Sequence, residues 1–574
     1  MTKPRTFAAC ALLAPLSLAA CAPKTATVAS AKPAASPAAS ASPASSAPTP
    51  TATPVVLYDN LGSLHHAVTT KSPQAQKFFD QGMRLLYGFN HAEAIRSFNE
   101  AARLDPDCAM AYWGAAIALG PNINLPSDAE GETTARALVA KARLLGPKVS
   151  AAEREYIEAA VARYAGPPNP QDRHANDEAY ADAMREVAKN HPDDPDAQAL
   201  FAESMLDLRP WQQWNHDGTP APGTEEIERT LETALKKFPD HPGLNHYYIH
   251  TEEGGPHPER ARAAAARLPA LEPGAGHLVH MPSHIYIHTS QWNDASTANE
   301  RAIEVDRAYL AGPHAEGAYS MMYVAHNFQF LWATASMEGR SAVALKAARD
   351  MTAPFDEKMV RAMEKDMPGV DYTMAPPLIA EVRFGHWAEI LKEPAPPADF
   401  RYLTAMWHFA RAFAFARTGK MEQARDEQLA LQQFVFSLKD DEMIGPLNTA
   451  KGIFGVGTKL LAGELMAADG KLDDAIALEE EAVAAEDALS YDEPPAWPLP
   501  TRHYLGALLL QAKKPSEAVA VYQADLKKNP ENGWALFGLE KAWELGRAAE
   551  AKGAHERFAK AWAHADVTLT TSRF

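Results

Sequence analysis

The chain has 574 residues, enough for several ordinary domains or for one long repeat array. It contains 55 Lys and Arg against 73 Asp and Glu, and the resulting net charge of −18 predicts that no nucleic acid is bound. Three cysteines are too few for a disulfide framework, and no apolar run after residue 20 approaches the length that crosses a bilayer. Composition therefore excludes a multipass membrane protein and a disulfide scaffold.

The N-terminal segment predicts export and lipid anchoring. Two basic residues precede the apolar run 7–20, as in a secretory signal peptide. The run ends in LAAC at 18–21, which resembles the lipobox of bacterial lipoproteins. The resemblance implies removal of the signal peptide 1–20, lipidation of Cys21 and, because Ala22 rather than Asp follows, attachment to the outer membrane facing the periplasm. An ordinary signal peptide without lipid is the alternative.

Residues 21–54 predict a disordered tether between the lipid anchor and the folded body. Of the 33 residues from 22 to 54, 30 are Ala, Pro, Ser or Thr, and none is aromatic. Such a segment cannot bury enough apolar surface to offset the entropy lost on ordering. We therefore expect the folded body to comprise residues 55–574.

The body shows helical periodicity and an internal repeat of 34 residues. A unit that starts at Ala75 has, at positions 8, 20, 24, 27 and 32, the residues Gly82, Ala94, Phe98, Ala101 and Pro106. Units that start at Ala405, Val456 and Leu499 repeat parts of this pattern. The pattern resembles the tetratricopeptide repeat (TPR), in which two antiparallel helices cross closely. We therefore predict an all-α fold, a right-handed TPR solenoid of stacked helical hairpins.

Longer segments narrow the resemblance to exported bacterial TPR proteins. They are FNHAEAIRSFNEAARLDPDCAMAYWGAAIALGPNIN (89–124), NHYYIH (245–250), GHLVHMPSHIYIH (276–288), YDEPPAWPLPTRHYLGALLL (491–510) and NPENGWALFGL (529–539). The resemblance implies the fold and supplies no reaction, so the chemistry must be argued from the residues.

Histidines are concentrated in one part of the chain. Residues 241–288 hold eight of the 21 histidines. If repeats start at Pro242 and Gly276, His246 and His280 share position 5, and His250 and His284 share position 9. Positions 5 and 9 lie 40° apart around a helix, so each pair shares one face. In known proteins of this repeat class, that face lines the concave ligand groove.

We therefore predict a histidine-lined concave groove that a transition metal or a ligand occupies. The residues expected to bind zinc, copper or nickel are His246, His250, His280, His284 and Glu253. Those expected to line the groove around them are His277, His288, His326, Trp211 and Trp214. The two tryptophans have core packing as their alternative role, and Pro282 favours a helix start that would loosen the pairing of the neighbouring histidines.

Two classes of function follow from this pattern. The leading one is a membrane-tethered binding or scaffold protein for a peptide or protein partner, with or without a bound metal. The rival is a metal-dependent hydrolase in which Glu252 or Glu253 activates a metal-bound water. Tyr247 and Met281 stand where an HExxH peptidase needs its glutamate, so that motif is missing.

Overall fold

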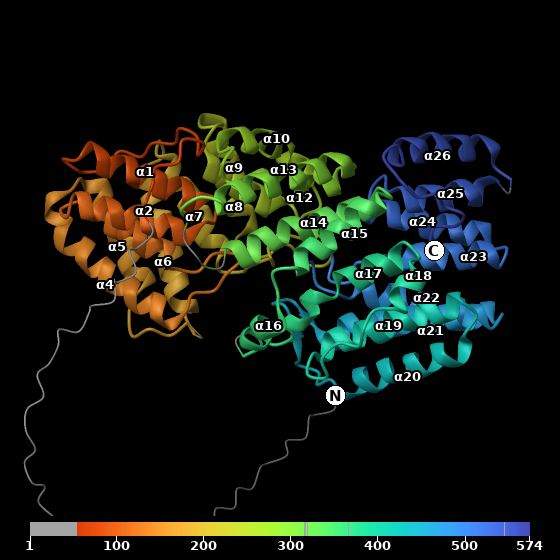
Figure 1. Ribbon diagram of the computed structural model, residues 1–574. Helices are drawn as coiled ribbons and strands as arrows, with labels where there is room; N and C mark the ends of the chain where they lie inside the picture. The colour runs from red at the N-terminus through yellow and green to blue at the C-terminus, as the bar shows by residue number, and fades with distance from the viewer. Residues whose placement is uncertain (1–53, 171, 315–316, 318, 366, 545) are drawn as a thin grey trace, which may run out of the picture. The chain divides into compact units, whose positions relative to one another are not determined.

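The computed structural model describes residues 54–574, apart from 171, 315–316, 318, 366 and 545. The predicted signal peptide, Cys21 and the tether up to residue 53 lie outside this range. The described residues form stacked antiparallel helices (Figure 1), so the predicted all-α, TPR-type solenoid is confirmed. Among the described helices, none has the length and apolarity needed to cross a bilayer.

The helices of the first half are coloured red to green in Figure 1. They are α1 (Pro73–Tyr87), α2 (His91–Leu104), α3 (Ala109–Ala118), α4 (Ala129–Leu145), η1 (Gly146–Lys148), α5 (Ala151–Arg163), α6 (His174–Asn190), α7 (Pro195–Leu206), α8 (Thr224–Lys237), α9 (Pro242–Glu252), η2 (Pro258–Ala261), α10 (Arg262–Leu271), α11 (Gly276–His280), α12 (Pro282–His288) and α13 (Trp292–Leu310).

The second half, green to blue, continues the stack of helices. Its elements are the π-helix η3 (Tyr319–Tyr323), α14 (Val324–Met337), α15 (Ser341–Thr352), α16 (Glu357–Met363), η4 (Val370–Met374), α17 (Pro376–Arg383), α18 (Trp387–Ile390), α19 (Arg401–Arg417), α20 (Met421–Ser437), β1 (Met443–Ile444), β2 (Asn448–Thr449), α21 (Ala450–Ala468), α22 (Leu472–Asp487), α23 (Thr501–Gln511), α24 (Pro515–Lys528), α25 (Gly533–Glu544) and α26 (Ala548–Ala561).

The predicted repeat units correspond to packed helix pairs. Helices α1 and α2, α19 and α20, α21 and α22, and α23 and α24 each pack together. Residues 242–309 form two pairs in matching register, α9 with α10 and α11–α12 with α13. Within the described ranges, the only paired strands are β1 and β2, which are two residues each and antiparallel.

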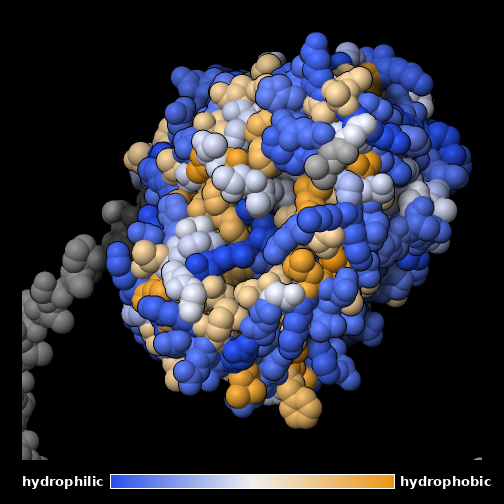
Figure 2. Space-filling view, turned by 90° about the vertical axis from the view of Figure 1, so that its right-hand side faces the viewer, coloured by the Kyte–Doolittle hydropathy of each residue, from blue (hydrophilic) through white to orange (hydrophobic). Residues whose placement is uncertain are grey.

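Local sequence explains where helices begin. Pro73 opens α1, and the Ser72 hydroxyl accepts a hydrogen bond from the Ala75 amide at 3.2 Å. Ser150 and Glu153 form a reciprocal capping box at the start of α5. Each cap satisfies amide groups that the first helical turn leaves without partners. The face in Figure 2 is mainly hydrophilic, with apolar side chains in small separate patches, as expected when apolar faces are buried between helices.

Glycines allow the close helix crossings that the repeat pattern predicted. A Cβ on Gly82 or on Gly114 would lie 2.5 Å from the Phe98 ring, which is fully buried between them. The same arrangement recurs near the C-terminus, where a Cβ on Gly506 or Gly538 would lie 2.4 or 2.1 Å from the Tyr522 ring. An aromatic ring of one helix thus fills the space that two glycines leave on its neighbours.

Substituting Gly506 by Ala is expected to destabilise the fold by about 1–3 kcal/mol, because the added methyl overlaps a ring that cannot move away. Tyr522 is fully buried and its hydroxyl is hydrogen-bonded to Ser572 at 2.7 Å. Gly455→Ala is the matched control: this glycine is also inside a helix, but a Cβ there meets nothing within 4 Å. In thermal unfolding, Gly455→Ala should leave the free energy of unfolding unchanged or raise it by up to about 1 kcal/mol. Equal unfolding temperatures for the two variants would contradict the crossing argument.

A buried carboxylate, Asp196, connects the segment that precedes α1 to α1 itself and to the start of α9. Its oxygens lie 2.7 Å from His66 Nδ1 and 3.1 Å from His241 Nε2, and one accepts a hydrogen bond of 2.6 Å from the Tyr87 hydroxyl. Burial opposes the charged imidazole, but the hydrogen bond and the charge of Asp196 outweigh it and raise the pKa of His66 to about 9.

The contribution of His66 to stability should therefore depend on pH. Because its pKa is raised from an ordinary value of 6.5, the stabilisation is complete below about pH 6.5 and is lost as the pH rises through about 9. We expect wild type to exceed His66→Gln by roughly 2 kcal/mol in unfolding free energy near pH 6, with the difference shrinking by pH 10. His65→Gln, at a mostly exposed neighbouring imidazole, is the control. A difference that grows with pH would contradict this assignment.

Candidate metal centre

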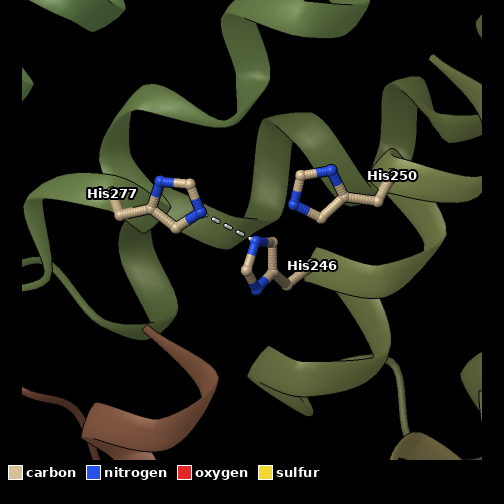
Figure 3. Close-up of side chains that lie close together, drawn as sticks. All are labelled: His246, His250 and His277. Carbon is tan, nitrogen blue, oxygen red and sulfur yellow. Dashed lines mark hydrogen bonds between the residues drawn. The ribbon is translucent and has the colours of Figure 1, made fainter. Parts of the chain in front are cut away.

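Helices α9, α11–α12 and α14, the first helices of three successive hairpins, bring histidines together in two groups. In each group, one ring nitrogen per residue lies within 4.8 Å of the others. The α9 group, drawn in Figure 3, consists of His246, His250 and His277. The α12 group consists of His280, His284 and His326.

The residues predicted to share one ion are thus divided between two groups. His246 Nε2 lies 3.1 Å from His277 Nε2, whereas His280 Nε2 lies 2.9 Å from His284 Nε2. His277 and His280 are three residues apart on α11, and each joins a different group. Pro282 does not separate His280 from His284, since Met281 before it keeps helical dihedral angles. His277 and His326, which were predicted only to line the groove, complete the two groups.

Glu253 lies between the two groups and contacts the outer nitrogens of their rings. One carboxylate oxygen is 2.8 Å from His250 Nδ1, and the other is 3.1 Å from His284 Nδ1. Its position corresponds to that of an outer partner, which orients imidazoles and raises their basicity. Glu252, the other predicted base, lies outside both groups, with its carboxylate 3.5 Å from Arg260.

The expectation that these histidines line an open groove is wrong. His246, His250, His277, His280 and His284 are each at most 3% exposed. Loops from distant parts of the chain cover the inner helix faces, and a repeat pattern cannot predict the path of such loops. Two phenylalanines complete the enclosure.

Each phenylalanine packs on all three rings of one group. The Phe89 ring centroid lies 4.5, 5.8 and 5.2 Å from those of His246, His250 and His277. The Phe330 ring centroid lies 4.8, 4.5 and 5.0 Å from those of His280, His284 and His326. Each phenylalanine ring therefore forms an apolar wall along its group.

Burial keeps most of these imidazoles neutral, which is the state that binds metals. It lowers the pKa of His250 to about 3 and that of His326 to about 4. The pKa values of His246, His277 and His280 also lie well below the ordinary range, because burial and neighbouring imidazoles both disfavour the charged form.

Hydrogen bonds on the outer nitrogens determine where the protons of the α12 group lie. His280 Nδ1 is 2.6 Å from Asn299 Oδ1, and Asn299 Nδ2 donates to the Ala295 carbonyl at 2.8 Å, which fixes the amide orientation. His284 Nδ1 donates to the Glu493 carboxylate, and His326 Nδ1 lies 3.1 Å from Gln329 Oε1. Each Nδ1 therefore faces an oxygen acceptor, and in a neutral ring each Nε2 then carries a lone pair.

Glu493 is the functional residue that the sequence argument missed. It belongs to the segment YDEPPAW (491–497), in which Pro494 and Pro495 predict a rigid loop before a repeat. Its carboxylate accepts hydrogen bonds from both His284 and His288, more than 200 residues earlier in the chain. Burial opposes ionisation, but these two imidazoles hold the pKa of Glu493 at about 2. The acidic residue beside two prolines was the available signal, but nothing in the sequence indicated its partners.

A pocket of about 800 Å³ adjoins the α12 group. Glu493, His288 and Phe330 lie in its wall, so two side chains that contact His284, Glu493 and Phe330, also line the pocket. The predicted groove residues Trp211 and Trp214 also line it, together with Tyr491, Pro494, Pro495 and Trp497. The volume is in the range of ordinary ligand pockets. The pocket, rather than the histidine face itself, is the accessible concave surface.

No protein-family model and no curated protein matches the sequence. Solved structures match at low similarity. They include an IFIT1 monomeric mutant with Gppp-AAAA, at 12% identity over 86% of this chain and 91% of that one, with a TM-score of 0.32. The human IFIT1 dimer with m7Gppp-AAAA matches at 13% identity over 86% and 92%, with a TM-score of 0.31. The P58(IPK) TPR domain matches at 14% over 83% and 99%, with a TM-score of 0.21.

Likenesses at this level transfer no ligand or partner to this chain. The fold and the site by themselves define a TPR-type helical-repeat protein with an enclosed, imidazole-rich centre beside a ligand-sized pocket.

Proposed function

We propose that this protein is a metal-dependent binding scaffold. The α12 group holds one divalent transition metal ion, zinc, copper or nickel, and the adjoining pocket binds a peptide or protein segment. The observation that carries the proposal is the contact of 2.9 Å between His280 Nε2 and His284 Nε2, two atoms whose rings already donate from Nδ1.

Two lone pairs facing each other at this distance repel unless a cation lies between them. Two nitrogens bound to one ion at 2.0–2.1 Å lie roughly 2.9–3.4 Å apart for angles between 90° and 110°. The observed contact is at the lower end of that range. His326 supplies the third nitrogen and is the least buried of the group, which leaves a side for water or an exogenous ligand. The alternative cation is a single proton shared by the two rings.

The metal would also shape the pocket. His284 belongs to the proposed coordination group through Nε2 and holds Glu493 through Nδ1, and Glu493 lies in the pocket wall. Fixing His284 therefore fixes the loop that carries Tyr491 and the two prolines. Aromatic and proline side chains with acidic neighbours such as Asp487 favour a peptide over a polyanion, so we propose no nucleic-acid ligand.

The hydrolase alternative has weaker support. Glu252 points to Arg260, and Glu253 is absent from the residues that line the pocket. Phe330 lies between the pocket and the three imidazoles of the α12 group. A substrate in the pocket would thus meet the ring before the ion.

The cellular setting is part of the proposal. The LAAC motif at 18–21 and the following Ala- and Pro-rich segment support export and a lipid anchor on Cys21. Anchoring at the outer membrane, facing the periplasm, would leave the body free to meet a partner there. Cys21→Ser should release the protein from membranes or leave its signal uncleaved, and unchanged fractionation would contradict the anchor.

Metal analysis and calorimetric titration of untagged protein test the function. We expect one tightly bound zinc ion per chain. Removal of this metal should change the fluorescence of the tryptophans that line the pocket. Binding of zinc with no fluorescence change would separate the metal from the pocket and refute the scaffold role. Absence of metal binding would favour the shared proton.

A further inference from the structure

We propose that the α9 group binds a second ion, monovalent copper, through His246, His250 and His277. This inference goes beyond the site proposed above, and it stands on different side chains. Figure 3 shows the three rings turned toward a common space, with His246 Nε2 and His277 Nε2 3.1 Å apart.

The hydrogen bonds of the α9 group leave ring nitrogens without partners. His246 Nδ1 lies 2.8 Å from the Tyr87 carbonyl oxygen and therefore donates, so His246 Nε2 carries a lone pair. His250 Nδ1 is 2.8 Å from Glu253, and His250 Nε2 has no hydrogen-bond partner although its side chain is only 1% exposed. Buried polar atoms without partners are uncommon and costly. An ion at the common point would occupy this nitrogen.

Without an ion, hydrogen bonds within the protein leave more ring nitrogens of the α9 group unpaired than they would with an ion bound. If His277 Nε2 donates to His246 Nε2, both His250 Nε2 and His277 Nδ1 remain without partners. With an ion bound by all three Nε2 atoms, only His277 Nδ1 remains unpaired. The second arrangement leaves fewer unsatisfied polar atoms in the same volume.

The surroundings of the α9 group differ from those of the α12 group in exposure and charge. All three members are buried, whereas His326 makes the α12 group partly accessible. Phe89 stacks on His250 and His277 with interplanar angles of 16° and 18°, and Trp211 meets His250 edge-on at 90°. These rings close the sides from which a fourth, water ligand would approach.

The site offers few donor atoms and little negative charge, and these two properties together favour monovalent copper. Zinc in proteins is almost always four-coordinate, so three nitrogens in a closed site suit it poorly. Glu253, which contacts His250 of this group and also His284 of the α12 group, can balance at most one positive charge here, and a divalent ion would leave a buried excess charge. Imidazole nitrogen is an established copper donor, and monovalent copper carries the single charge that the site can balance.

Anaerobic titration of the metal-free, untagged chain with Cu(I), in competition with a chromophoric Cu(I) chelator, tests the inference. We expect one Cu(I) per chain, with affinity reduced 100-fold or more in His250→Ala and unchanged within threefold in His326→Ala. Circular dichroism and thermal unfolding monitor folding of both variants. Equal affinity in wild type and His250→Ala would overturn the proposal.

X-ray absorption on the wild-type copper complex gives a second readout that depends on no variant. Three light-atom neighbours with the outer-shell scattering of imidazole rings are expected, and a fourth ligand would overturn the closed-site argument. Loss of copper in His326→Ala but not in His250→Ala would place copper in the α12 group and refute the second site. Zinc binding measured in the same variants reports separately on the α12 group, so the two proposals can fail independently.

Discussion

Replacing His284 by Ala is expected to weaken zinc binding by about 100-fold or more, the largest effect of any single substitution in the α12 group. The change removes one of three nitrogen donors and also frees Glu493 from its hydrogen bond. Calorimetric titration near neutral pH measures the loss directly. Thermal unfolding is followed in parallel, because His284 is buried against Phe330 and the cavity left by its removal should lower stability while the helical fold persists.

His257→Ala is the matched control for this measurement. His257 belongs to the same histidine-rich stretch, but its side chain is 62% exposed and lies outside both groups. Its loss should leave zinc affinity within a factor of two. A similar decrease in both variants would show that surface imidazoles, and not the α12 group, bind the metal.

Glu493→Gln is expected to lower zinc affinity by about 10–100-fold, although the residue is not placed as a ligand. The amide keeps the size of the side chain but removes the negative charge that holds His284 and His288. Because Glu493 also lines the pocket, the fluorescence change of the pocket tryptophans on zinc binding should become smaller. Zinc titration followed by both calorimetry and fluorescence measures the two effects together.

Asp492→Asn provides the control, since it removes a half-buried carboxyl one residue away in the same loop. Burial raises the pKa of Asp492 to about 7. The Asp492 carboxyl belongs to none of the three-residue groups that could hold a metal. Zinc affinity should change by less than threefold. An effect equal to that of Glu493→Gln would mean that loop stability, rather than the contact with His284, governs metal binding.

Several features of the fold could be predicted because they repeat. Gly82 with Phe98 and Gly506 with Tyr522 occupy equivalent repeat positions, and in both cases a ring fills the space above a glycine. The pairing of α9 with α10 and of α11–α12 with α13 follows from the same spacing. Close crossing of two helices requires a small residue at a fixed position, so the sequence must retain it.

The sequence also predicts that these histidines lie close together, but not that they form two separate groups. His246 and His250, like His280 and His284, lie one helical turn apart and therefore share a face, as the structure confirms. The sequence-based argument placed all four around one ion. The structure adds His277 to one group and His326 to the other, because neighbouring first helices approach at an angle that repeat numbering does not contain.

The sequence by itself determined the helical hairpins, their register and the shared face of each histidine pair, because these depend on spacing along one helix or between adjacent repeats. Only the tertiary structure decided the burial of that face, the covering rings of Phe89 and Phe330, and the contact of Glu493 with His284. These features come from loops and from residues about 200 positions apart. Loop paths have no periodicity, and their energies depend on contacts that exist only after the hairpins have packed.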